Sequence, residues 1–106
     1  MKHSIRNAAF ILLAASIAAP AFAQSAGADT YKSKCSMCHG PDGTAATPMG
    51  KMYKIPSFKD PDQVKATDAS LIAITKDGKG KMPAYTGKLT DDQIKDVVAY
   101  IRTLQK

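Results

Sequence analysis

The feature that most constrains this chain is the run Cys35-Ser36-Met37-Cys38-His39, in which two residues separate the cysteines and a histidine follows directly. This C-x-x-C-H spacing is typical of covalent haem attachment, where each thiol adds to one haem vinyl group and the imidazole can reach the iron. A thioredoxin-like dithiol fits less well, because no pattern of strands and helices surrounds the motif. A structural zinc site needs four ligands, and a plain disulfide leaves His39 unexplained. We therefore predict one haem c, bound through Cys35 and Cys38.

The N-terminal segment has the three regions of a secretory signal peptide. Lys2 and Arg6 precede an almost wholly apolar run over residues 8–19, and Ala21-Phe22-Ala23 forms a small-x-small cleavage site. We expect cleavage after Ala23. An uncleaved membrane anchor is the alternative, but the apolar run is shorter than the roughly 20 residues that a spanning helix needs.

Cleavage would leave residues 24–106 as one soluble domain in the periplasm, where the haem motif also fits because haem c is attached after export. A domain of this size buries only a modest core, and small exported domains usually add disulfides or a metal. The chain has just two cysteines, and both belong to the motif. A covalently bound haem would supply the missing apolar mass at the centre of the fold.

The hydrophobic pattern predicts an all-α domain of three to five short helices wrapped around that haem. A first helix is expected over residues 27–38, a second over 67–76 with Thr67 as N-cap, and a third from Thr90, where Thr90-Asp91-Asp92-Gln93 fits a capping box. The third helix has an apolar stripe at helical spacing, formed by Ile94, Val97, Val98, Ile101 and Leu104. Residues 40–65 are rich in turn signals and predict a loop that wraps a large ligand.

The iron then needs a sixth ligand or an open position. Outside the predicted signal peptide His39 is the only histidine, so the candidates are methionine, lysine, tyrosine or water. Met49 and Met52 follow His39 closely, where the chain must still support the same face of the haem. Met82 is far enough along the chain to return on the other face. Gly78 and Gly80 would let the backbone approach closely there, and Pro83 would stiffen the loop.

We therefore favour His39 and Met82 as the two metal ligands, with a ligand switch to Met49 or Met52 left open. A thioether ligand raises the reduction potential, and iron closed on both sides can change only its oxidation state. These features predict a one-electron carrier that cycles between Fe(II) and Fe(III) and is not an enzyme. A haem enzyme or gas sensor with a labile sixth ligand, and a haem subunit of a larger oxidoreductase, are the alternatives.

Residues 24–106 resemble the class I cytochromes c, of the small bacterial monohaem type, over their whole length. The resemblance rests on Cys35–His39, on Met82-Pro83-Ala84-Tyr85 and on the terminal helices. It implies the cytochrome c fold and an electron-transfer role. It also implies that Gly27 and Tyr31 on the first helix cross Val97 and Tyr100 on the last, and that the carbonyl of Pro48 accepts a hydrogen bond from His39. The chain has no tryptophan, which some relatives use near a propionate, so the propionate partners stay open.

The charge is mildly basic. Lysine and arginine total 15 against 9 aspartates, a net charge of +6, and loss of Lys2 and Arg6 would leave 13 against 9, or +4. Two interpretations are equally favoured: a solvated lysine surface, and a basic rim that steers an acidic redox partner to the haem edge. Nucleic acid is a poor partner for a chain with so little arginine. We expect a monomer that exchanges electrons with redox proteins.

Overall fold

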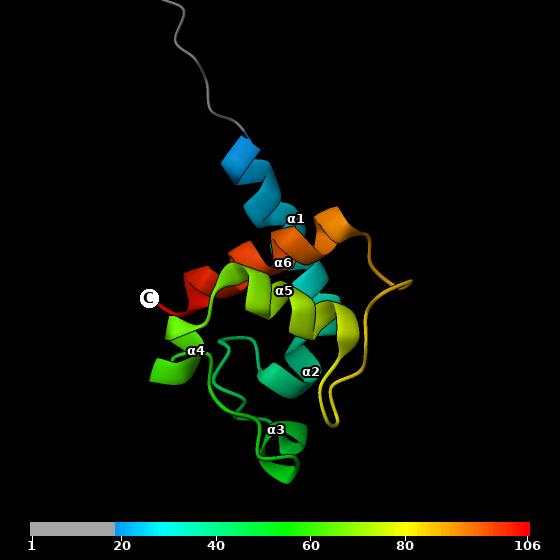
Figure 1. Ribbon diagram of the computed structural model, residues 1–106. Helices are drawn as coiled ribbons and strands as arrows, with labels where there is room; N and C mark the ends of the chain where they lie inside the picture. Colours follow the sequence, from blue (N-terminus) through cyan, green and yellow to red (C-terminus); the bar gives the residue numbers. More distant parts are fainter. Residues whose placement is uncertain (1–18) are drawn as a thin grey trace, which may run out of the picture.

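The computed structural model describes residues 19–106, which form an all-α fold (Figure 1). Most of the predicted signal peptide, residues 1–18, lies outside the described residues. The helices are α1 (Ala19–Lys34), α2 (Ser36–His39), α3 (Pro48–Met52), α4 (Pro61–Lys65), α5 (Asp68–Asp77) and α6 (Asp91–Leu104). Between residues 19 and 106 the only β-type pairing consists of two isolated bridges, Lys79 with Met82 and Thr86 with Leu89. The predicted all-α class is confirmed.

The first helix differs from the prediction in its bounds. We expected one helix over residues 27–38, but α1 ends at Lys34 and α2 begins at Ser36. The backbone turns at Cys35, whose φ and ψ are −119° and −34°. The amide of Cys38 bonds to the carbonyl of Cys35 at 3.3 Å, one residue nearer than in a regular α-helix. Cys35 therefore lies at the break, as the N-cap of α2, and Cys38 lies within α2.

The last helix forms as its sequence predicts. The hydroxyl of Thr90 accepts from the amide of Gln93 at 3.1 Å, and the Gln93 side chain accepts from the amide of Thr90 at 2.8 Å. This reciprocal pair is a complete capping box, and it satisfies two backbone donors at the helix start. The predicted apolar stripe faces inwards, since Ile94, Val97, Val98 and Ile101 are all buried. Thr67 caps α5 through the amide of Ser70, which confirms the second predicted N-cap.

The two terminal helices cross and form the main core, with α6 lying across α1 in Figure 1. A Cβ atom on Gly27 would overlap the carbonyl oxygen of Asp96 and lie 3.1 Å from the Cβ of Tyr100. The ring of Tyr31 is 2% exposed, and its centroid is 5.3 Å from that of Tyr100. The predicted crossing is confirmed, and it depends on the missing side chain at Gly27.

Residues 40–65 contain the two short helices α3 and α4, so the described residues 19–106 form six helices where three to five were expected. The segment is tied to α6 by Arg102 and Gln105. The Arg102 guanidinium reaches the carbonyls of Gln63, Val64 and Ala66, and Gln105 donates to the carbonyls of Phe58 and Gln63. Across residues 19–106, none of the helices has the length and apolar character needed to cross a bilayer.

Candidate functional site

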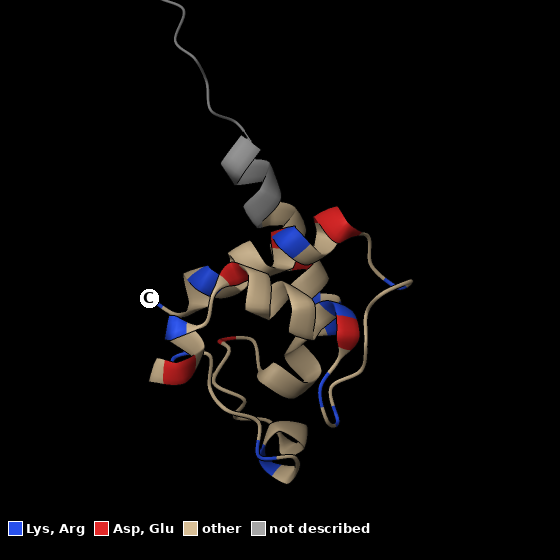
Figure 2. Cartoon of the chain, viewed as in Figure 1, with Lys and Arg blue, Asp and Glu red and all other residues tan. Residues whose placement is uncertain are grey.

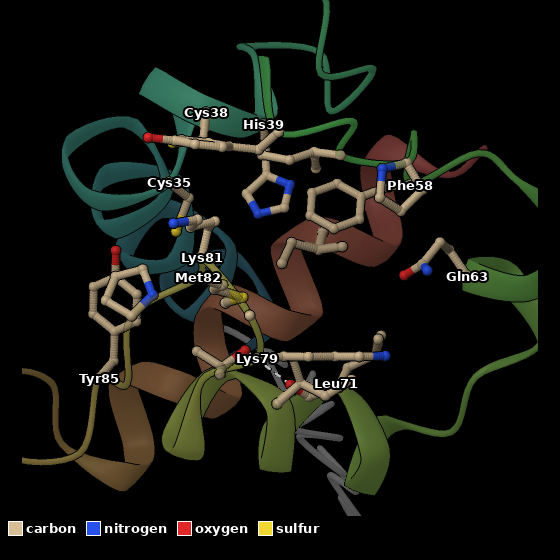
Figure 3. Close-up of a pocket in the computed structure, with 18 of the residues that line it drawn as sticks. Cys35, Cys38, His39, Phe58, Gln63, Leu71, Lys79, Lys81, Met82 and Tyr85 are labelled. Carbon is tan, nitrogen blue, oxygen red and sulfur yellow. Dashed lines mark hydrogen bonds between the residues drawn. The ribbon is translucent and has the colours of Figure 1, made fainter. Parts of the chain in front are cut away.

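A cavity of about 400 Å³ opens between α2, α5, α6 and the loop that follows α5 (Figure 3). Four residues predicted to bind haem line it: Cys35, Cys38, His39 and Met82. Its remaining walls are mainly apolar and include Phe58, Leu71, Ile74, Val97 and Ile101. The predicted residue Pro48 and the alternative ligands Met49 and Met52 are not among the lining residues. The fold thus brings both thiols, the imidazole and one thioether to a single apolar space.

The imidazole of His39 lines this cavity and is neutral, as a nitrogen ligand for a metal must be. Its ring stacks on Phe58, with centroids 4.6 Å apart and an angle of 17° between the planes. Burial lowers the pKa of His39, so the imidazole carries no proton charge at neutral pH. Its Nδ1 atom is buried and has no hydrogen-bond partner among the described residues. A neutral imidazole and a thioether that line one apolar cavity form a donor set that fits haem iron, and the buried Nδ1 is left free for a hydrogen bond.

Cys35 and Cys38 are free thiols that line the same cavity. Burial, and to a smaller extent the neighbouring Cys38, raises the pKa of Cys35 to about 11. Cysteines in redox dithiols instead have a lowered pKa, because the thiolate is the nucleophile. The environment of Cys35 therefore argues against a thioredoxin-like function and agrees with a thiol that is held in place for haem.

Met82 lies on the loop between α5 and α6, which we call the Met82 loop and define as residues 78–89. Gly78 has a φ of +79°, and a Cβ atom there would lie 2.7 Å from the carbonyl oxygen of Met82 and 2.9 Å from the amide nitrogen of Ala84. The predicted close approach of the backbone is confirmed at this glycine. Gly80 has nothing within 4 Å of a Cβ position, so its role is the positive φ of +58° in the turn between Lys79 and Met82.

Pro48 is the exposed first residue of α3, and its role stays a prediction. The residues on either side of Pro48 hold segment 45–50 against the haem motif. The Thr47 hydroxyl donates to the carbonyl of Cys38 at 2.7 Å and accepts from the amide of Gly50 at 2.9 Å. A Cβ atom on Gly50 would overlap the carbonyl oxygen of Ala45 and lie 2.8 Å from that of Cys38. Segment 45–50 therefore packs directly on the backbone of the motif.

Two site residues were missed or undervalued from the sequence. Phe58 stacks on His39, and its only signal was being a lone aromatic among polar and proline residues. Tyr85 lines the cavity, and its hydroxyl donates to the carbonyl of Lys34 at 2.9 Å. Burial raises the pKa of Tyr85, with smaller contributions from the two cysteines, so this hydroxyl stays protonated. Thr47 does not line the cavity, but the sequence had a readable signal for it: a threonine N-cap followed by proline at the first position of α3.

The rim of the cavity is basic. Four lysines are among its lining residues, while no aspartate is: they are Lys34, Lys54, Lys79 and Lys81. Figure 2 shows basic residues on α3 and on the turn after α5. Beside them Met52 is 67% exposed and Tyr53 is 38% exposed, and the ammonium of Lys81 lies 6.0 Å from the centre of the Tyr53 ring. The cavity entrance therefore combines positive charge with exposed apolar surface.

Comparisons with known proteins identify the family of this chain. Residues 22–101 match the model of the family described as "Cytochrome C oxidase, cbb3-type, subunit III". Cytochrome c6 of Bryopsis maxima is 35% identical over 80 residues, which span 71% of this chain and 84% of that protein. Cytochrome c-551 of Halorhodospira halochloris is 39% identical over 67 residues, which span 63% and 77%.

A solved structure is also similar to this chain. The KustC0563 c-type cytochrome superposes with a TM-score of 0.70 at 29% sequence identity, and the match covers 76% of this chain and 98% of that one. The chain therefore belongs to the cytochrome c family, as a small monohaem class I cytochrome c whose family cofactor is haem c.

Proposed function

We propose that this protein is a periplasmic one-electron carrier, with haem c attached through Cys35 and Cys38 and with His39 and Met82 as axial ligands. The observation that carries the proposal is the convergence of these four side chains on one apolar cavity. Figure 3 shows the His39 ring entering from α2 and the Met82 side chain entering from the Met82 loop. When bound, the haem iron supplies the single electron by cycling between its ferrous and ferric states.

The residues of the chain have distinct tasks in this proposal. His39 offers a neutral nitrogen, and the Met82 thioether favours ferrous iron relative to a second nitrogen ligand, which raises the reduction potential. The apolar walls exclude water and lower the local dielectric constant around the site. The carbonyl of Pro48 is our candidate acceptor for the unsatisfied Nδ1 of His39. This bond would fix the imidazole tautomer, and the anchoring of Thr47 to Cys38 supports it.

The absorption spectrum of the oxidised protein tests the ligands. We expect the weak methionine-to-iron charge-transfer band at the red end of the spectrum, and slow binding of cyanide or carbon monoxide. Met82→Ala should abolish the band. Met52→Ala is the matched control, since Met52 is 67% exposed and outside the cavity lining, and it should retain the band, as should Met49→Ala. A wild-type protein that lacks the band and binds carbon monoxide readily would overturn the carrier function in favour of an enzyme or sensor.

Removal of residues 1–23 and release into the periplasm are part of the proposal. The Ala21-Phe22-Ala23 sequence supports cleavage after Ala23, and haem attachment after export supports the location. Mass spectrometry of the haem-bound protein should give a chain that begins at Gln24. A chain that retains residues 1–23 in the membrane fraction would instead identify an anchored protein.

A second candidate function is a haem subunit that passes electrons within a larger oxidoreductase. The observation in its favour is the matching family, which is described as a subunit of a cbb3-type oxidase. The carrier hypothesis predicts that the native protein elutes from a sizing column as a free monomer. Stable co-elution with a membrane oxidase would favour the subunit function.

A further inference from the structure

The Met82 loop is attached to the rest of the molecule on two sides. On the α5 side, the amide of Tyr85 donates to the carbonyl of Thr75 at 3.0 Å, and the hydroxyl of Thr86 donates to the carbonyl of Lys76 at 2.8 Å. On the α1 side, the phenol of Tyr85 donates to the carbonyl of Lys34 at 2.9 Å. Of the hydrogen bonds in the described part of the chain, this is the one that joins the Met82 loop to α1.

The carbonyl of Lys34 is available because of the break at Cys35. In a continuous helix it would accept from the amide of Cys38, four residues on. That amide bonds to the carbonyl of Cys35 instead, so Lys34 is left as an unpaired acceptor at the end of α1. The Tyr85 hydroxyl takes the vacant place. The bond therefore joins the residue directly before Cys35 to a residue three positions after Met82.

Between its attachments the loop has two backbone bonds of its own, between Lys79 and Met82, but few side-chain packing contacts. Gly80 has no atom within 4 Å of its Cβ position, and Lys79, Lys81, Pro83 and Ala84 are exposed. Residues with few packing contacts open locally at low free-energy cost. A single bond that closes the loop onto α1 then has a large share in deciding how often the loop opens. In Figure 3 the Tyr85 ring lies at one side of the cavity, on the side of Cys35.

We propose that Tyr85 is a positioning residue that holds the Met82 loop closed by bonding to the end of α1. It acts through Met82 and does not itself bind the iron. The inference rests on the proposed ligation by His39 and Met82. Loss of the hydroxyl should raise the population in which the loop is open and Met82 is released, and leave the closed state otherwise unchanged.

The test is Tyr85→Phe in the haem-bound protein, which keeps the ring and removes only the hydroxyl. Cyanide binds ferric haem after the sixth ligand leaves, so its binding rate follows the open population. We expect this rate to rise about fivefold, the factor that corresponds to the net worth of one hydrogen bond. We also expect the methionine-to-iron band to fade at a lower temperature than in the wild type, before helical circular dichroism is lost.

Tyr100→Phe is the matched control, since Tyr100 is a half-buried tyrosine outside the cavity lining. It should leave the cyanide rate and the band at wild-type values. If Tyr85→Phe behaves like Tyr100→Phe while Met82→Ala abolishes the band, the positioning role is wrong and the ligation stands. If the wild type lacks the band, the proposed function itself fails. If band and helices in Tyr85→Phe are lost together at one lowered temperature, the residue is only structural.

Discussion

At Gly27 a single hydrogen atom in place of a side chain allows the terminal helices to touch. Because an added Cβ would overlap the carbonyl oxygen of Asp96, Gly27→Val should force α1 and α6 apart. Overpacking of this kind costs about 1–3 kcal/mol of unfolding free energy. Denaturant titration of the haem-bound protein measures it.

The control for this substitution is Ala26→Val, which adds a similar group to an exposed residue of the same helix. It should change the unfolding free energy by no more than about 0.5 kcal/mol. If Gly27→Val and Ala26→Val changed the unfolding free energy by the same small amount, the close contact of α1 and α6 at Gly27 would not be needed for stability.

Single residues differ in how far the sequence revealed them. Cys35, Cys38 and His39 are defined by local spacing, so their chemistry could be predicted without a structure. The stacking of His39 on Phe58 and the bond from Tyr85 to Lys34 could not, because each joins segments that approach only after folding. The partner of the His39 imidazole stays a prediction, because its Nδ1 has no hydrogen bond in the structure.

Among the elements, α6 was the most predictable and α3 and α4 the least. The capping box and the apolar stripe of α6 are local signals that act together. Helices α3 and α4 have five residues each, which is too short for local propensity to form a helix alone. Tertiary bonds stabilise them instead, from Thr47 to Cys38 in one case and from Arg102 in the other. The break between α1 and α2 had no glycine or proline to signal it.

Arg102 connects elements, and its substitution should show which of its bonds matter. It pairs with Asp68 at 2.9 Å and also reaches the carbonyls around the C-terminal end of α4. Arg102→Met should lower the unfolding free energy by about 1–2 kcal/mol, because carbonyls that are part-buried at Gln63 and Ala66 lose a charged donor. Urea titration provides the measurement.

The comparison is Asp68→Asn, which removes only the ion pair. Asp68 has a side chain that is 72% exposed, so this pair contributes less than about 1 kcal/mol and its contribution falls with added salt. If the two substitutions had equal effects, the ion pair that joins α6 to α5 would account for the role of Arg102, and its bonds to the carbonyls at the end of α4 would contribute little.

For the whole molecule, the haem is an integral part of the core. Without haem, the apolar lining of a cavity of about 400 Å³ would be exposed to water, and a small domain has little stability to offset that loss of buried apolar surface. Cys35→Ala/Cys38→Ala, prepared without haem, should therefore have no cooperative thermal transition by circular dichroism. The haem-bound wild type serves as the reference, and an unchanged transition in the double variant would show that the protein core suffices.

The basic cavity rim should control how the whole molecule meets its partners. We expect electron transfer with an acidic redox protein to slow as ionic strength rises, since salt at about 0.1 M screens charges over about 10 Å. Lys81→Gln should reduce this salt dependence, because Lys81 lines the rim. Stopped-flow rates at several salt concentrations provide the measurement.

Lys95→Gln is the matched control, because Lys95 is an exposed lysine of α6 outside the cavity lining. It carries the same change in net charge and should alter the salt dependence less. Equal effects of both substitutions would favour a lysine surface that only maintains solubility.

The crossing of α1 and α6 also sets an order of events in time. The ribosome makes α1 and the two cysteines early and makes α6 last, so the core that depends on Gly27 and Val97 cannot close while the chain is still growing. Until then no terminal helix covers the thiols. Because haem is expected to be attached after export, the enzymes that attach it should act on the complete chain before α6 packs on α1 and closes the core beside Cys35.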